Sequence, residues 1–267
     1  MIVNHWKCPF RECIRCLCAH MNTHISESII TRTWEFGETD LLVSFFTTDR
    51  GRLKGVAKGA RKSSRRFANC LDSFCLTRLE YERKSGRDLY FLHSGKLIHG
   101  FPKLRTDFHA LSMASYMVEL AETLFPLGVA EQRMFFLLKD ALAALEGNIQ
   151  KEELRILFEA KALALGGYSI NFERCCECGR RYAAEGRAVF KQKKGGIACL
   201  KCEKESARLP GLDPDAARRL DQIQTTPLDD FQKAPLTNKL LDEMKKVLRL
   251  HLSYSLGKEL KTARYLS

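Results

Sequence analysis

Two closely spaced pairs of cysteines are the residues whose type and spacing point most directly to chemistry in this chain. Cys175 and Cys178 form one C-x2-C pair within ERCCECGRR, and Cys199 and Cys202 form another within GGIACLKC. Each pair in a tight turn can bring two thiolate sulfurs to within about 2.3 Å of one metal ion, and two pairs complete a tetrahedron. The spacing therefore predicts one Zn²⁺ ion held by these four cysteines.

A zinc ion with four thiolate ligands has no open coordination position, so it can neither activate water nor bind a substrate. We interpret the site as structural, because the metal would fold an excursion, residues 175–202, that is too small to have its own core. Cys176 is a spare cysteine. The alternative interpretation is a redox-active dithiol or a set of free thiols. A zinc ion with four thiolates has a net charge of −2. The basic residues around it in sequence more than offset this charge: Arg174, Arg180, Arg181, Lys191, Lys193, Lys194 and Lys201.

The segment DRGRLKGVAKGARKSSRRF (49–67) combines a high positive charge with a glycine at every fourth position. Glycine lets a backbone approach a phosphate chain closely. Side chains an even number of positions apart share one face of a strand, which places Arg52, Lys54 and Lys58 together. The residues 61–66 are expected in a mobile loop that follows the strand.

A small barrel with such a basic strand and loop fits binding of single-stranded nucleic acid, through phosphate contacts and base stacking. The aromatic residues expected near the basic strand are Trp34, Phe36, Phe67 and Tyr90. The alternative interpretation is a solvated charged edge that protects the sheet from pairing with other strands.

The chain shows no set of residues typical of an enzyme. It contains no G-x-x-x-x-G-K-[ST] phosphate loop, no G-x-S-x-G elbow and no H-E-x-x-H motif. Carboxylates such as Glu119 and Glu122 lie on a predicted helix without a partner group for acid–base chemistry. We therefore expect no enzymatic activity.

The composition is that of a globular protein with an excess of positive charge. The 267 residues include 44 Lys and Arg against 32 Asp and Glu, a formal net charge of +12. This excess favours an anionic partner, with nucleic acid before an anionic membrane surface. The sequence has no apolar run of membrane-spanning length and no signal-peptide core at its start, so we expect a reducing compartment. Eleven cysteines there favour metal binding or free thiols over disulfides.

The first 20 residues hold four cysteines, at positions 8, 13, 16 and 18, but no helical or strand period. Periodic sequence begins only after Met21. We interpret residues 1–20 as a disordered extension that arises from a start codon assigned too early, with Met21 as the true start. The alternative is a second metal site formed by these cysteines and His20.

Strand signals dominate from residue 28 to about residue 100. The turn DRG (49–51) predicts a hairpin in which Gly51 takes a positive φ. Four or five short strands with close turns predict a small barrel or sandwich. The segments that carry β-branched, aromatic or alternating residues are 28–34, 40–48, 52–60, 72–83 and 88–98.

Helical periodicity follows after about residue 105. Asp213 and Pro214 are typical of the N-cap and first position of a short helix in an otherwise looped segment, 203–234. Residues 236–266 predict either one long amphipathic helix or two helices broken at Gly257. The other predicted helices are 107–125, 130–145 and 151–167.

The order of these parts resembles the bacterial recombination mediator family RecO. The resemblance rests on the glycine-punctuated basic segment 37–67, on GGYSINFERCCECG (166–179) with the second cysteine pair, and on LHLSYSLGKELKTARYL (250–266). It covers about residues 21–267. Chains of the family usually begin just before the first strand, so residues 1–20 depart from the resemblance.

The resemblance implies an α+β multidomain fold, with an N-terminal OB-fold β-barrel and an α-helical domain that carries an inserted four-cysteine zinc module. The expected divisions are an extension (1–20), an OB-fold nucleic-acid-binding domain (21–104), a first helical part (105–174), the zinc module (175–202) and a second helical part (203–267).

The resemblance also implies a role in DNA repair and recombination. It implies binding of single- and double-stranded DNA, annealing of complementary strands and, with RecR, loading of RecA onto DNA coated by single-stranded-DNA-binding protein. The C-terminal tail of that protein is expected to contact the helical domain. A cytoplasmic, nucleoid-associated location and no membrane partner are expected. The residues that the resemblance assigns to DNA contact are Arg52, Lys54, Lys58, Arg61, Lys62, Arg65 and Arg66. The competing hypothesis is a zinc-ribbon module that binds protein or RNA and has no annealing activity.

Overall fold

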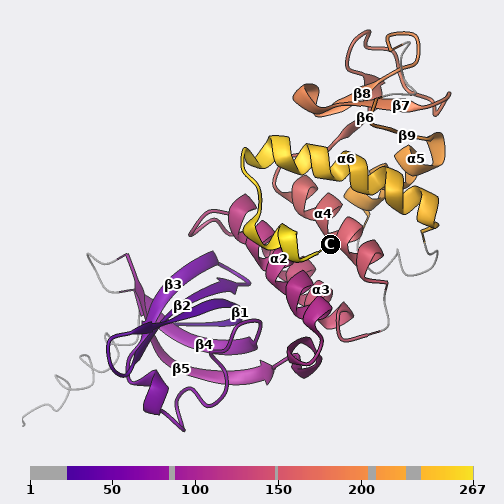
Figure 1. The fold of residues 1–267 in the computed structure, drawn as a ribbon. Helices are drawn as coiled ribbons and strands as arrows, with labels where there is room; N and C mark the ends of the chain where they lie inside the picture. Colours follow the sequence, from indigo (N-terminus) through magenta and orange to yellow (C-terminus); the bar gives the residue numbers. More distant parts are fainter. Residues whose placement is uncertain (1–22, 84–87, 148–149, 204–208, 227–235, 267) are drawn as a thin grey trace, which may run out of the picture. The chain divides into compact units, whose positions relative to one another are not determined.

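The computed structural model describes residues 23–83, 88–147, 150–203, 209–226 and 236–266 (Figure 1). The chain forms two compact units. Of the described residues, the first unit contains those up to 47 and those within 53–100, and the second contains 48–52 and those from 101 onward. Both interpretations of residues 1–20 concern a segment outside the described residues, so they stay predictions.

Five strands of the first unit close into a barrel in the order β1-β2-β3-β5-β4. β1 is antiparallel to both β2 and β4, β5 is antiparallel to β4, and β3 runs parallel to β5. The mixed α+β class with a β-rich N-terminal part is confirmed. The strands are β1 (Thr23–Phe36), β2 (Asp40–Thr47), β3 (Gly51–Ala57), β4 (Leu76–Arg83) and β5 (Tyr90–His99).

β1 is the longest strand because its two halves pair with different partners. Its first half pairs with β4 and its second half with β2, and the register shifts between Ile30 and Arg32. Such a bulge bends a strand and increases its twist, which lets one strand serve two neighbours in a closed sheet. The sequence predicted this strand only from residue 28, because the preceding residues are mostly polar.

Apolar side chains that alternate along the strands fill the barrel. Val43, Phe45, Leu79 and Tyr81 are fully buried, and the ring centroids of Phe45 and Tyr81 lie 5.5 Å apart in an edge contact. The buried hydroxyl of Tyr81 lies 3.0 Å from the hydroxyl of Ser26, so its polar atom has a partner. The barrel therefore has a core of its own.

The turn between β2 and β3 requires glycine. Gly51 has a φ of 66°, which confirms the predicted conformation of this turn. A Cβ atom there would lie 1.8 Å from the carbonyl oxygen of Val129. Residues 48–52 therefore pack as part of the second unit.

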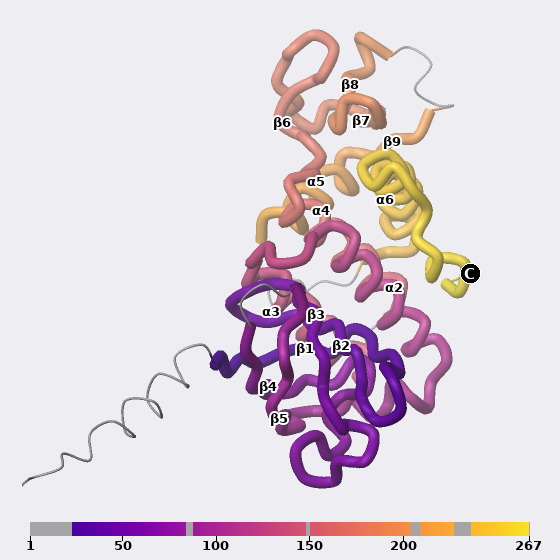
Figure 2. Tube along the Cα trace, turned by 90° about the vertical axis from the view of Figure 1, so that its left-hand side faces the viewer, coloured from indigo at the N-terminus to yellow at the C-terminus, as the bar shows by residue number. Residues whose placement is uncertain are grey.

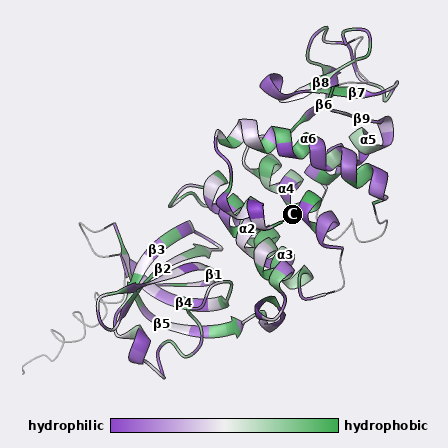
Figure 3. Ribbon diagram, in the orientation of Figure 1, coloured by the Kyte–Doolittle hydropathy of each residue, from purple (hydrophilic) through white to green (hydrophobic). Residues whose placement is uncertain are grey.

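The second unit is built around one central helix. α4 contacts α2, α3, α5 and α6, and Leu154, Phe158 and Leu163 on it are buried. Figure 3 shows apolar residues along these helices, which is typical of helices that bury one or more faces. Among the helices of the described ranges, none is long and apolar enough to cross a membrane. The helices are α2 (Phe108–Leu124), α3 (Gln132–Ala144), α4 (Lys151–Leu165), α5 (Pro214–Thr225) and α6 (Asn238–Leu256).

Asp213 and Pro214 stand at the start of α5, as predicted, but Asp213 makes no side-chain cap hydrogen bond. Its carboxylate instead accepts from Arg187 at 3.2 Å and from Lys239 at 2.7 Å. These two cations hold the pKa of Asp213 below its usual value, Lys239 having the larger effect. Asp213 therefore connects the start of α5 to Arg187 and, through Lys239, to α6.

α6 ends at Gly257, which has a φ of 62°, so the alternative with a break at this glycine is the observed one. A short 3₁₀ turn, η6 (Lys261–Tyr265), follows it. The carboxylate of Glu119 on α2 accepts from the backbone N–H groups of Lys261 and Thr262 at 3.0 and 2.8 Å, and from the Thr262 hydroxyl at 2.6 Å. Glu119 thus holds the C-terminal turn on α2.

A small four-stranded sheet lies within the second unit, in the order β6-β8-β7-β9. The sequence predicted only turns and loops here, because strands of two to five residues are too short to show a period. α5 contacts β6 and β9, and α6 contacts β9 (Figures 1 and 2). The strands are β6 (Asn171–Cys175), β7 (Ala188–Lys191), β8 (Gly196–Ala198) and β9 (Gly211–Leu212).

A candidate metal centre and a basic face of the barrel

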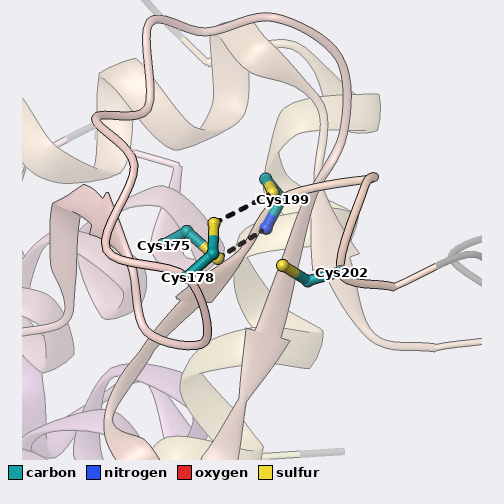
Figure 4. Close-up of side chains that lie close together, drawn as sticks. All are labelled: Cys175, Cys178, Cys199 and Cys202. Carbon is teal, nitrogen blue, oxygen red and sulfur yellow. Dashed lines mark hydrogen bonds between the residues drawn. The ribbon is translucent and has the colours of Figure 1, made fainter.

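Two turns of the small sheet bring four cysteines together (Figure 4). Cys175 ends β6 and Cys178 lies in the turn after it, whereas Cys199 follows β8 and Cys202 lies in the next turn. The four sulfur atoms all lie within 4.8 Å of one another, and those of Cys178 and Cys199 are 3.9 Å apart. Parallel pairing of β6 with β8 places the two turns at the same end of the sheet.

Backbone N–H groups are aimed at the sulfur of Cys175. The N–H of Cys199 donates to it across 3.3 Å. The first turn is closed by a bond from the N–H of Gly179 to the carbonyl of Cys175, and Gly179 has a φ of 70°. The second turn is closed by a bond from the N–H of Cys202 to the carbonyl of Cys199. The backbone therefore stabilises negative charge on sulfur before any metal is considered.

The pKa values of the thiols differ accordingly. Burial raises the pKa of Cys175, but the N–H groups of Cys178, Cys199 and Glu177 more than offset this and lower it to about 6. The pKa of Cys202 is raised to about 12, chiefly by a hydrogen bond between its thiol and the sulfur of Cys178. Any thiol of the cluster that carries a proton must release it when a metal binds.

Cys176 is set apart from the cluster. Its N–H donates to the carbonyl of Ile197, and its side chain packs beside buried Val189 and Ala198. Burial is the main cause that raises its pKa. In the described part of the chain, the one group of side chains arranged to bind a metal comprises the other four cysteines.

The donor set fits a closed zinc site. Four sulfur donors from two turns can complete a tetrahedral shell. Acidic residues already pair with two of the neighbouring cations: Lys194 with Glu177 at 2.7 Å, and Lys191 with Glu203. The other basic residues near the site are exposed: Arg174, Arg180, Arg181, Lys193 and Lys201.

On the barrel, two exposed aromatic side chains share one face of β1. Trp34 is 41% exposed and Phe36 is 49% exposed, and they stand two positions apart. The ammonium of Lys54 on β3 lies 6.0 Å from the centroid of the Trp34 ring. A cation beside an exposed ring is the arrangement that binds a phosphate next to a stacked base.

The basic loop after β3 is fastened to the hairpin of β1 and β2. The N–H of Gly59 donates to the carboxylate of Asp40 at 2.8 Å, and Gly59 has a φ of 65°. Arg61, in the short turn η1 (Ala60–Lys62), pairs with Glu35 at 3.1 Å and donates to the carbonyl of Glu38. These contacts position the loop beside the hairpin that carries the exposed aromatics.

The predicted DNA-contact residues fall into three groups. Lys54, Lys58, Lys62 and Arg65 have no acidic partner among the described residues, and the last three are exposed. The guanidinium groups of Arg61 and Arg66 are engaged, Arg66 donating to the carbonyl of Lys58 at 2.7 Å. Only the first group presents cations that are available to an external phosphate.

Arg52 forms the third group. Its guanidinium donates to the carbonyl oxygen of Glu122 at 2.8 Å and lies 4.0 Å from the Glu122 carboxylate. Its side chain is only 18% exposed. The structure therefore separates Arg52 from the other basic residues and gives it an internal contact in the second unit, which also gives Glu122 a partner.

Two of the four aromatics are not available for stacking. Phe67 is 5% exposed and belongs to the barrel core. Tyr90 packs partly buried against the same core, and its ring lies 5.5 Å from that of Tyr81 in an edge contact. The sequence does not distinguish an aromatic residue of the core from one that is exposed for stacking.

Sequence reasoning missed a buried polar network between α2 and α4. The hydroxyl of Tyr116 donates to the carboxylate of Glu159 at 2.6 Å, and Arg155 donates to the same oxygen at 2.7 Å. Burial and the Glu159 carboxylate raise the pKa of Tyr116. The spacing of Arg155 and Glu159, four residues apart on one helix, was the one local signal of this network.

Comparison with known proteins covers both units. A model of the N-terminal part of recombination protein O matches residues 21–101, and a model of its C-terminal part matches residues 105–264.

Curated relatives agree with these matches, and each is named DNA repair protein RecO. The relative from Syntrophus aciditrophicus (strain SB) is 30% identical over 247 residues, 91% of this chain and 95% of the relative. The one from Desulfatibacillum aliphaticivorans is 31% identical over 247 residues, 90% and 95% of the two chains. The one from Anaeromyxobacter sp. (strain K) is 31% identical over 238 residues, 89% and 93%. On these matches, the chain belongs to the RecO family.

Proposed function

We propose that this chain acts in DNA repair and recombination as a mediator that binds single- and double-stranded DNA and anneals complementary strands. With RecR it would help to load RecA onto DNA coated by single-stranded-DNA-binding protein, in the cytoplasm at the nucleoid. Membership of the RecO family supports this proposal. The observation that carries it is the exposed pair Trp34 and Phe36 beside Lys54 and the other available cations of the barrel.

We assign the barrel to the OB-fold class. The strand order and the parallel pairing of β3 with β5 support this assignment. OB-folds bind single strands along a positively charged groove with aromatic stacking platforms. The proposed domain divisions follow the same scheme, with the barrel at 21–104, helical parts at 105–174 and 203–267, and the zinc module at 175–202.

The barrel would act on DNA by contact alone. Lys54, Lys58, Lys62 and Arg65 bind phosphates and release counterions, which makes the affinity fall steeply with salt. Trp34 and Phe36 stack on bases and keep them unpaired. A screened and unstacked strand meets its complement with less repulsion, so annealing needs no bond to be made or broken in the DNA. Arg61 and Arg66 position the loop.

Cys175, Cys178, Cys199 and Cys202 would hold one structural zinc ion. The clustering of their sulfurs and the N–H groups aimed at Cys175 support this assignment. The ion supplies folding free energy to a sheet of very short strands rather than catalysis.

Equilibrium binding of a labelled single strand across a salt series tests the barrel surface. The variant Lys54→Ala/Lys58→Ala is compared with Arg78→Ala/Lys96→Ala, whose two positions are register partners on β4 and β5 of the same barrel. Loss of two phosphate contacts should lower the slope of log K against log salt by about 1.4 for the first variant only.

Equal losses in the two variants would assign the binding to net charge and not to this surface. Weak binding by every form of the chain, with strong binding of a protein or RNA ligand, would favour the zinc-ribbon alternative.

A further inference from the structure

A groove of about 760 Å³ opens between β9 and α6 in the second unit. This volume is within the roughly 300–1,000 Å³ typical of ligand sites. Leu209 and Pro210 line one side and Leu250 lines the other, so part of the wall is apolar. None of its described lining residues is a cysteine, although Leu209 also packs against the small core that contains Cys175.

Three cations of the described residues line this groove. Arg187 lies before β7, and Lys246 and Arg249 stand three positions apart on α6, where both are exposed. Neither Lys246 nor Arg249 has an acidic partner in the described part of the chain. Among the described residues of the lining the one acidic residue is Glu243, which accepts from the backbone N–H of Asp213 at 2.8 Å. The groove therefore carries an excess of positive charge.

Arg187 is fixed in place by the fold. Its Nη1 donates to Asp213 at 3.2 Å and its Nη2 to the carbonyl of Gly211 at 3.1 Å. Its buried Nε has no partner among the described residues. These contacts occupy Arg187 inside the protein, as those of Arg61 and Arg66 do on the barrel, so Lys246 and Arg249 are the cations of the described lining that are available to a phosphate.

We propose that this groove binds the phosphate backbone of a second DNA strand. Phosphates would contact Lys246 and Arg249, and a sugar or base would lie against Pro210 and Leu209. The inference rests on the proposed function. Annealing brings two polyanions together, and a cationic site on each compact unit gives each strand its own place. The competing hypothesis is that the groove binds an acidic peptide, and the experiment below distinguishes the two ligands.

Co-binding of two strands that cannot pair tests the proposal in the full chain. Donor-labelled and acceptor-labelled oligo-dT are mixed with limiting protein, and energy transfer reports simultaneous binding, while anisotropy reports binding of the first strand. The variant Lys246→Ala/Arg249→Ala is compared with Lys139→Ala/Lys258→Ala, which removes the same charge from the second unit outside the groove. Both α6 positions are exposed, so melting temperature should not change.

The groove variant should weaken binding of the second strand about tenfold and lower its salt slope by about 1.4, with first-strand affinity and the control unaffected. Unchanged energy transfer would overturn the proposal. It would also be overturned if the variant lost binding of an acidic, apolar-ended peptide while it still bound two strands. Failure of the proposed function shows separately, as first-strand binding that is indifferent to Lys54→Ala/Lys58→Ala.

Discussion

Single residues in this chain owe their roles to the backbone around them. Cys175 and Cys176 are neighbours of the same type in one apolar cluster, but backbone N–H groups point at the sulfur of Cys175. The pKa of the first thiol is lowered and that of the second is raised. The C-x2-C spacing predicted this division, because the geometry of a four-residue turn is local.

Substitution of one cysteine tests the metal assignment. Cys178→Ser should lose zinc and lower the melting temperature strongly, because a structural zinc site contributes on the order of 10 kcal/mol to folding. Cys176→Ser should keep one zinc ion per chain and melt within a few degrees of the wild type. Metal content and thermal melting check both. Full zinc content in the Cys178→Ser chain would contradict the assignment.

His251 gives a second prediction at this scale, through pH. It is 3% exposed, its Nε2 lies 2.6 Å from the carbonyl oxygen of Tyr168, and its buried Nδ1 has no partner among the described residues. Burial lowers the pKa of His251 below 6.5. The unfolded chain therefore binds this proton more readily, so its contribution to stability is full above pH 6.5 and is lost as the pH falls below it.

Chemical unfolding at pH 7.5 and pH 5.5 measures this contribution. His251→Gln can keep a donor toward Tyr168 but does not titrate. The wild type should lose up to about 1 kcal/mol more than the variant between the two pH values. An identical pH dependence in the two chains would show that His251 does not titrate on unfolding.

At the scale of elements, the sequence predicts long regular segments and misses short ones. The helices near 107–125, 130–145 and 151–167 were predicted within a few residues, because periods of several turns are readable locally. β6–β9 were missed, since strands of two to five residues are too short to show a period. The sequence also did not show which aromatic residues of the candidate site are exposed. Trp34 is exposed and Phe67 is buried, and this difference is determined by the packing of the barrel.

The network that joins α2 and α4 gives a prediction at this scale. Glu159 is 2% exposed and accepts from both Tyr116 and Arg155. Glu159→Ala removes the acceptor and leaves a partly buried guanidinium and a buried hydroxyl unpaired, which should cost about 3–5 kcal/mol of unfolding free energy. Denaturant unfolding measures it.

Glu152→Ala is the matched control, because its carboxylate pairs with Lys245 at 2.8 Å on a more exposed surface. An exposed ion pair contributes at most about 1 kcal/mol. Similar losses in the two variants would show that the buried network stabilises the chain no more than a surface pair does.

At the scale of the whole molecule, the net charge of +12 is divided among surfaces with different uses. Some cations are held internally, as Arg52 is by Glu122. Others face the candidate zinc centre, the barrel face or the groove beside α6. Net charge alone favoured nucleic acid as a partner but could not say which cations are free, because pairing is decided by tertiary contacts.

The rate of annealing of two complementary labelled strands tests the central claim most directly. The wild type should anneal them well above the spontaneous rate. Lys54→Ala/Lys58→Ala should lose most of this acceleration, and Arg78→Ala/Lys96→Ala should retain it. Annealing that neither variant changes, or none by the wild type, would contradict the account of the barrel as the surface on which this chain handles DNA.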